Sequence, residues 1–253
     1  MRVLVCVKRV PAPGAKINLT GDGMAIDTTH LAFTTSPHEE CAVEAGVQIV
    51  EEHGGSGTVL TLGPPAAEEQ LRYAVSVGMH DAVLVEAGEE WDPQRTAAAL
   101  VDAIAELEAR DGTFDLLLFG NESADAGGFQ VGIRVAVALD RAMVNGAKGL
   151  SVADGVAVVE RESDAGRERY ELPLPAAVGI KEGLNLPRYP TMRGRLASKK
   201  AEVEHASAAA PPGGLAMTRL ERPVEEQSET VVLGHGPDAA PAVVDALEEL
   251  GVL

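Results

Sequence analysis

The sequence lacks several features that mark nucleic-acid-binding proteins. Aromatic residues make up only 3% of its 253 residues, which argues against binding of single strands by base stacking. Acidic residues outnumber basic ones by 39 to 21, and the net charge of −18 repels nucleic acid and anionic membranes. We therefore expect no nucleic-acid partner.

Cysteine and long apolar runs are also scarce. The two cysteines, Cys6 and Cys41, have no CxxC spacing, so neither a disulfide scaffold nor a zinc site is expected. The six histidines are scattered, and no Ser/His/acid or Cys/His arrangement suggests nucleophilic catalysis, so we expect no metal ligands and no catalytic residues. No apolar run is long enough to span a membrane, and the chain opens on a strand-like run in place of a signal peptide. A cytoplasmic protein without membrane insertion is expected.

The remaining pattern indicates an α/β protein. Apolar runs at 2–7, 57–62, 81–86 and 114–119 predict buried strands, and helical periodicity over 36–52, 66–78 and 92–110 separates them. This alternation predicts a doubly wound, mostly parallel sheet in which the first and fourth strands lie side by side. Alternating runs around the polar turn 163–166 predict an antiparallel edge hairpin, and residues 16–26 predict a smaller hairpin.

The stretch 114–139 combines a strand, a glycine-rich loop and a helix. Gly127 and Gly128 lie near the predicted helix start, where backbone amides can approach a phosphate. An ordinary strand-to-helix loop that needs two glycines to turn explains the same pattern. Because the first strand is expected beside the fourth, both strand ends would face one crevice, where nucleotides bind in this fold class. Asp125 either orients ribose hydroxyls or loop amides, or caps the following helix.

A second helix start is expected at the same end of the sheet. Ser36 is a suitable N-cap, Pro37 suits the first helical position, and Glu39 completes a capping box. The residues alone favour a surface position for His38.

The chain divides by composition into two parts. Residues 1–200 are predicted to form a nucleotide-binding α/β domain that ends in a recognition loop at 181–200, rich in Pro, Arg and Gly. Residues 201–253 are predicted to form an arm, with a linker at 206–214 and an amphipathic helix at about 239–250. That helix docks either on a partner or back on its own domain.

Four stretches together resemble one known family. They are the opening strand 2–11, the helix start 36–45 with Ser36 in place of the usual Asn, the loop 120–132, and the segments 171–176 and 185–190. In these stretches the chain resembles the β subunit of electron transfer flavoproteins, and the resemblance runs over residues 2–200 in the family's order.

The resemblance implies a non-enzymatic electron carrier, one subunit of an αβ heterodimer. Such a subunit accepts electrons from dehydrogenases, such as the acyl-CoA dehydrogenases of fatty acid β-oxidation. The electrons pass through an FAD held mostly by the α subunit to an acceptor such as a quinone oxidoreductase. The β subunit itself holds AMP as a structural nucleotide. Two alternatives stay open: an electron-bifurcating β subunit with a second FAD in place of AMP and docking of NADH, and a stand-alone adenine-nucleotide-binding module.

The resemblance also implies site residues. The cofactor-binding positions are Cys6, Ser36, Pro37, His38, Glu39, Leu62, Gly120, Asn121, Asp125, Gly127, Gly128, Phe129, Gln130 and Val131. The partner-binding positions are Tyr189, Met192 and Arg193, with Met192 where the family commonly places an apolar anchor, usually Leu. The run 125–129 matches neither the acidic run of typical AMP-binding members nor the Asp-Thr-Ala-Gln run common in bifurcating ones, so both ligands stay possible. Leu186 replaces the usual Glu before Pro187, which leaves the partner dehydrogenase open.

Overall fold

The computed structural model describes residues 1–88, 91–208, 214–223 and 230–253. These residues form two compact units, Met1–Thr218 and Arg219–Leu253. The first unit contains the large sheet and the segments that the sequence assigned to a nucleotide site and to partner binding. The second contains the C-terminal helix.

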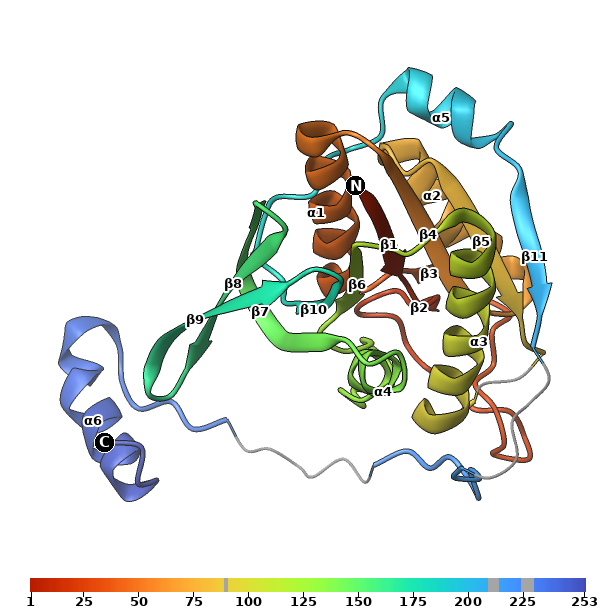
Figure 1. The fold of residues 1–253 in the computed structure, drawn as a ribbon. Coiled ribbons are helices and arrows are strands. Elements are labelled where there is room, and N and C mark those ends of the chain that lie inside the picture. Colours follow the sequence, from red (N-terminus) through yellow and green to blue (C-terminus); the bar gives the residue numbers. More distant parts are fainter. Residues whose placement is uncertain (89–90, 209–213, 224–229) are drawn as a thin grey trace. The chain divides into compact units, whose positions relative to one another are not determined.

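A nine-stranded sheet is the centre of the first unit (Figure 1). Its order is β11-β5-β4-β1-β6-β10-β7-β8-β9, so the predicted neighbours of β1 are confirmed. Pairing is parallel from β11 to β7 and antiparallel from β7 to β9. The strands are β1 (Arg2–Cys6), β4 (Ser56–Gly63), β5 (Asp81–Glu86), β6 (Leu116–Gly120), β7 (Ala142–Ala153), β8 (Val156–Ser163), β9 (Gly166–Pro173), β10 (Ala176–Ile180) and β11 (Val203–Ser207). The doubly wound, mostly parallel α/β class with an antiparallel edge hairpin is therefore confirmed.

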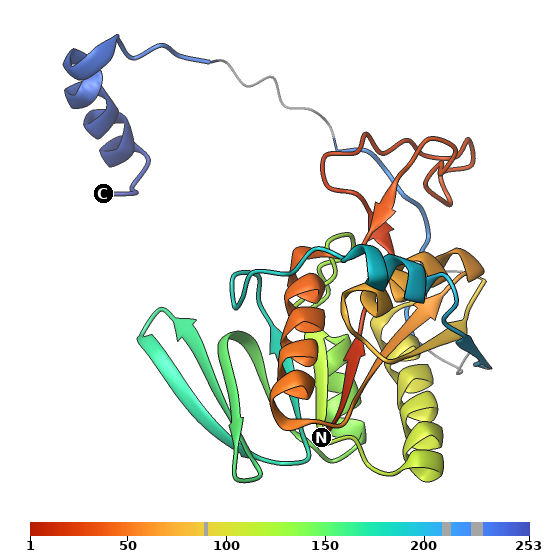
Figure 2. The ribbon, with the colours of Figure 1, turned by 90° about the horizontal axis from the view of Figure 1, so that it is seen from above.

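Helices cover both faces of the parallel strands (Figure 2). They are α1 (Pro37–His53), α2 (Glu68–Val77, after the 3-10 turn Pro65–Ala67), α3 (Pro93–Asp111), α4 (Val131–Ala138) and α5 (Met192–Ser198). Successive strand residues point to opposite faces. Val5 accordingly packs with Val47 of α1 and Leu71 of α2, whereas Leu4 packs with residues of α3 and α4. The central strands β6 and β10 are apolar because both of their faces are buried, whereas the edge strand β11 carries polar, exposed residues.

The structure corrects the prediction that residues 181–200 form only a loop. Residues Met192–Ser198 form α5, whose start is capped by a hydrogen bond from the Gly194 amide to Thr191 Oγ1 at 3.0 Å. The helix packs closely on α2, since a Cβ added at Gly194 would lie 2.1 Å from the Ser76 carbonyl oxygen. The sequence pattern did not predict this helix because it is only seven residues long and lies among Pro, Arg and Gly.

Three further differences concern strands. The sequence analysis missed β7, which carries two glycines and a register shift between Ala147 and Gly149. It also assigned residues 206–214 to a linker, but Ala206 and Ser207 belong to β11, and 209–213 lie outside the described residues. The predicted hairpin at 16–26 is reduced to a single antiparallel bridge between Leu19 and Ile26. A separate short pair joins β2 (Val10–Pro11) and β3 (Phe33–Thr34).

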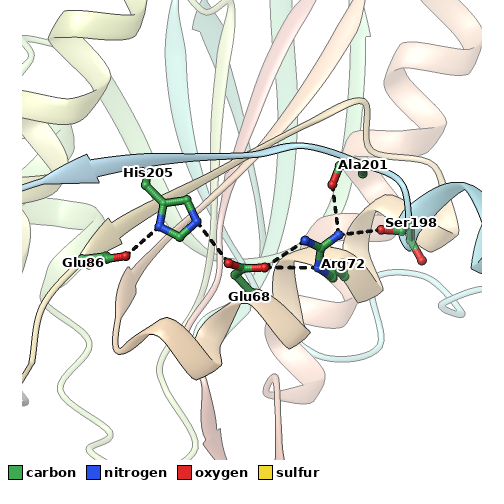
Figure 3. A network of polar contacts seen from close by, with 6 residues as sticks. All are labelled: Glu68, Arg72, Glu86, Ser198, Ala201 and His205. Carbon is green, nitrogen blue, oxygen red and sulfur yellow. Dashed lines mark hydrogen bonds and ion pairs between the residues drawn. The ribbon is translucent and has the colours of Figure 1, made fainter.

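A polar network fastens β11 and the end of α5 to α2 (Figure 3). His205 of β11 lies between two carboxylates, with Nδ1 2.6 Å from Glu86 Oε1 and Nε2 3.1 Å from Glu68 Oε1. Glu68 also accepts hydrogen bonds from Arg72, which donates to the Ser198 carbonyl at 2.9 Å. The chain after α5 is thereby held to the sheet edge by ion pairs from two elements.

The second unit confirms the C-terminal helix. A 3-10 turn at Gly236–Ala239 leads into α6 (Ala240–Glu249). Val243 and Val244 are exposed within this unit. Among the helices of the described ranges, none is long and apolar enough to cross a membrane.

Candidate functional site

The candidate site lies where the chain order reverses in the sheet. Strand β1 has β4 on one side and β6 on the other, and Cys6 pairs in register with Phe119 just before the loop that begins at Gly120. Ligands of doubly wound proteins bind outside the carboxyl ends of such strands. We call this place the crevice; its walls are the end of β1, the start of α1 and residues 120–131.

Glu39 joins two of these walls. Its Oε2 accepts from the Ser36 amide at 2.9 Å while Ser36 Oγ accepts from the Glu39 amide at 3.2 Å, which confirms the capping box. Its Oε1 accepts from the Lys8 amide at 2.7 Å. Burial raises the pKa of Glu39 to about 7, even though these hydrogen bonds favour the carboxylate. Both oxygens are thus engaged within the chain.

Gly120 allows the end of β6 to pass directly over the start of α1. A Cβ at this position would lie 2.7 Å from Glu39 Cγ and 3.4 Å from His38 Cβ. The next residue, Asn121, donates its amide to the Ile180 carbonyl at 2.8 Å and so fixes the start of the loop to β10. The glycine is required here by close approach and not by a turn.

Asp125 braces the loop against β1. Its Oδ2 forms an ion pair with Lys8 Nζ at 2.7 Å, and its Oδ1 accepts from the Ala126 amide at 2.7 Å. Partial burial raises the pKa of Asp125, but the hydrogen bond and charge of Lys8 outweigh it and hold the pKa below its usual value. Asp125 orients a loop amide, as one alternative predicted; the other alternative, a cap on α4, is wrong, because Gln130 occupies the N-cap position.

His38 is not the surface histidine that the residues alone favoured. Its side chain is 16% exposed, and its Nε2 lies 3.5 Å from Glu122 Oε1 in the loop. Its Nδ1 accepts from the Glu182 amide at 2.7 Å. One imidazole therefore contacts both the crevice loop and the segment that follows β10.

The amino end of α4 lacks a capping side chain. Gln130 lies at the N-cap, but its Oε1 accepts from the Arg134 guanidinium at 3.0 Å. The first turns of α1, α3 and α5 are capped, by Ser36, Asp92 and Thr191, whereas α2 and α6, like α4, have no capping side chain. No side chain at the cap therefore accepts a hydrogen bond from the first amides of α4. A bound phosphate can supply the missing acceptor.

The loop before α4 holds an unusual backbone conformation. Phe129 has φ 54° and Gly127 has φ 54°. Left-handed geometry is uncommon for a bulky residue such as Phe and concentrates at ligand sites. Phe129 is also 48% exposed. The loop therefore has the backbone geometry and the exposed aromatic side chain of a ligand-binding element.

The other predicted cofactor positions line the same region in different ways. Cys6 is buried, and burial raises the pKa of its thiol, so it is a neutral wall residue. Leu62 is half-buried near the end of β4. Pro37 is the first residue of α1, and Gly128 and Val131 are half-buried at the loop and the start of α4.

The three predicted partner-binding residues lie outside the crevice, in residues 186–196, which we call the docking segment. This segment carries exposed apolar side chains: Leu186 and Tyr189 at 89%, Met192 at 76% and Leu196 at 60%. Arg193 is exposed beside them, and no acidic residue occurs between Glu182 and Glu202. An apolar and basic surface of this kind is typical of a protein-binding site.

Sequence reasoning missed the residues that hold the docking segment. Arg188 donates to Glu44 Oε2 at 2.9 Å and to Glu51 Oε1 at 2.7 Å, both on α1. Glu44 is only 4% exposed. A carboxylate on the apolar face of a helix requires a partner, so Glu44 between Val43 and Ala45 was the available signal.

Within the described part of the chain, no cluster of His, Cys, Asp and Glu could hold a metal ion. The contacts of the crevice are hydrogen bonds, ion pairs and close packing around a loop and a helix start.

The fold and the crevice define a doubly wound α/β protein with its candidate ligand site at the strand switch point. The model of the electron transfer flavoprotein domain matches residues 23–211. An electron transfer flavoprotein subunit β from Syntrophomonas wolfei is 35% identical over 83% of this chain and 81% of its own length. Subunits of the same name are 36% identical in Mycobacterium leprae, over 79% and 77%, and 29% identical in Megasphaera elsdenii, over 83% and 79%. The chain belongs to the electron transfer flavoprotein β subunit family.

Proposed function

We propose that this chain is the β subunit of a heterodimeric electron transfer flavoprotein and that its crevice holds AMP. The main support for a nucleotide site is the start of α4, which has no capping side chain. It lies beside the loop that the ion pair of Lys8 and Asp125 holds against β1. A phosphate at this helix start accepts hydrogen bonds from the free amides and gains from the helix dipole.

The roles of the crevice residues follow from their contacts. Gly128 and Val131 bring backbone amides to the phosphate, while the Gly127 amide donates to the Ser123 carbonyl at 3.0 Å and shapes the loop. Cys6 and Leu62 supply apolar walls at the strand ends. Glu39 and Asp125 act as positioning residues, because their oxygens are engaged with the backbone and with Lys8. Small residues at 126–128 also leave room for the adenine nucleotide of a second FAD, so a bifurcating subunit is the second candidate.

The redox group of the complex is an FAD held mostly by the α subunit, which supplies the electron-accepting ring when it is bound. This chain contributes a surface to that junction and breaks no substrate bond. Its docking segment meets an electron donor, for which an acyl-CoA dehydrogenase or a related dehydrogenase is proposed. Met192 is an adaptable apolar anchor that suits contact with more than one partner. The onward acceptor is a quinone oxidoreductase or an equivalent.

Coexpression with an electron transfer flavoprotein α subunit tests this proposal. A yellow heterodimer that bleaches when a substrate-reduced acyl-CoA dehydrogenase is added is the expected result. Chains that fail to associate and bind no flavin would overturn it. A homodimer that hydrolyses ATP would instead support the stand-alone nucleotide module.

A further inference from the structure

One side of α1 is fastened at regular intervals to residues 182–188, which we call the strap. Among the hydrogen bonds that join them, three mark the register: Glu182 N to His38 Nδ1 (2.7 Å), Asn185 Nδ2 to the Cys41 carbonyl (2.9 Å) and Arg188 N to Glu44 Oε2 (3.1 Å). The Cys41 thiol also lies 3.6 Å from the Asn185 carbonyl oxygen. Each pair is 144 residues apart in sequence, so the strap keeps one register along the helix. Over this distance the helix rises about 9 Å, at 1.5 Å per residue.

The first of these three hydrogen bonds, from Glu182 to His38, which we call the first tie, lies at the crevice. His38, which accepts from the strap through Nδ1, faces Glu122 of the crevice loop through Nε2 at 3.5 Å. The loop also begins against this residue, since a Cβ at Gly120 would lie 3.4 Å from His38 Cβ. A shift of the loop on binding a nucleotide therefore acts directly on the start of the strap.

The last tie belongs to the docking segment. The Arg188 guanidinium donates to both oxygens of Glu44, at 2.9 and 3.1 Å, and to both oxygens of Glu51, at 2.7 and 2.9 Å. Glu44 is 4% exposed, and it also accepts from Gln48 Nε2 at 2.6 Å, so Arg188 completes the hydrogen bonding of a buried carboxylate. Arg188 immediately precedes Tyr189, so the same contacts set where the exposed apolar side chains begin.

We propose that the strap couples nucleotide occupancy of the crevice to the position of the docking segment, with Asn185 and Arg188 as positioning residues. This inference rests on the proposed function. The hydrogen bonds at Asn185 and Arg188 keep the strap from sliding along α1. A displacement at Glu182 is therefore transmitted along the strap to Arg188. Coupling is reciprocal, so a docked dehydrogenase strengthens nucleotide retention by the same factor.

The first experiment is hydrogen–deuterium exchange on the full heterodimer, stripped of nucleotide and then measured with and without AMP. AMP is expected to lower deuterium uptake in 182–196 as well as in 120–131. Protection confined to 120–131 would overturn the coupling. This readout needs no electron transfer, so it stays decisive even if no acyl-CoA dehydrogenase reduces the complex, a result that would count against the proposed function alone.

Two variants break the strap without leaving an unpaired buried charge. Asn185→Ala removes the middle tie, and Arg188→Ala combined with Glu44→Gln removes the last one together with the carboxylate it neutralises. Arg169→Ala is the matched control, because it removes one arginine from an exposed ion pair on the β8–β9 hairpin.

Both strap variants are expected to raise KM for the reduced dehydrogenase by at least about fivefold, the low end of typical coupling, with kcat little changed. In both, AMP no longer protects 186–196. Arg188→Lys with Glu44 intact retains part of the ion pair and is expected to restore part of the effect. An unchanged KM with AMP protection retained in both variants, or the same KM rise in the Arg169→Ala control, would overturn the positioning role.

Discussion

In the crevice, polar groups are buried and satisfied by the chain itself, whereas in the docking segment apolar groups are left in solvent. Glu39, 5% exposed, accepts hydrogen bonds from two backbone amides, while Met192 is 76% exposed. The first arrangement is held together by contacts within the chain; the second gains free energy only when a partner covers it. Substitutions in the crevice should therefore alter stability and nucleotide retention, and those in the docking segment should alter encounter with a partner.

The largest expected effect concerns the pH dependence that Glu39 imposes on the crevice. Its pKa of about 7 in the folded chain exceeds its ordinary value of 4.5. The contribution of Glu39 to the free energy of unfolding is thus fully present below pH 4.5 and is lost as the pH rises to about 7, by about 3 kcal/mol in total.

Glu39→Gln cannot ionise, so urea denaturation between pH 4 and 8 should show a flatter profile for this variant. Glu106→Gln on the exposed face of α3 controls for the loss of one acidic group. Parallel profiles of wild type and Glu39→Gln across the window would contradict the assignment of the buried carboxylate.

Gly120→Ala tests the close approach of β6 and α1. The new Cβ would lie 2.7 Å from Glu39 Cγ, and overpacking of this kind costs about 1 to 3 kcal/mol. Gly21→Ala is the matched control, because nothing lies within 4 Å of its added Cβ. Thermal unfolding should show a lower Tm for Gly120→Ala only. Equal Tm values for the two variants would show that β6 and α1 can move apart at no cost, which would contradict the requirement for glycine at position 120.

Asp125→Ala tests the brace between the loop and β1. The variant loses the ion pair to Lys8 and the hydrogen bond from the Ala126 amide. Because hydrogen bonds to charged groups contribute about 1.5 to 3 kcal/mol, roughly tenfold weaker retention of AMP is expected. Calorimetric titration of the stripped complex with AMP measures this. An unchanged affinity would remove Asp125 from the site.

Met192→Ala is expected to have the smallest effect on the molecule and to act on the other region only. Truncation of an exposed anchor at an interface costs about 1 to 2 kcal/mol of partner binding, so electron transfer from the dehydrogenase should slow by roughly tenfold. Flavin and AMP contents should be those of wild type. Loss of AMP in this variant would contradict the claim that the docking segment acts on partner binding and the crevice on nucleotide retention.

The regions also differ in how far the sequence predicted them. The strands β1, β4, β5 and β6 and the capping box at Ser36 follow from periodicity and capping chemistry within a few residues, and the order β5-β4-β1-β6 follows from the usual topology of doubly wound sheets. Strand β7 was missed because two glycines interrupt its pattern. The contacts of His38 and Arg188 were missed because their partners, such as Glu182 for His38 and Glu44 for Arg188, lie far away in the sequence, 144 residues in these two cases. Such contacts depend on the packing of the sheet and leave no local signal.

The most direct test of the account is extraction of the nucleotides bound to the copurified heterodimer, with their molar ratio to protein. We predict one FAD and one AMP per complex, with the AMP in the crevice of this chain. Two FAD and no AMP would assign the crevice to a flavin and contradict the AMP proposal. A complex without any nucleotide beyond one FAD would contradict the crevice as a nucleotide site.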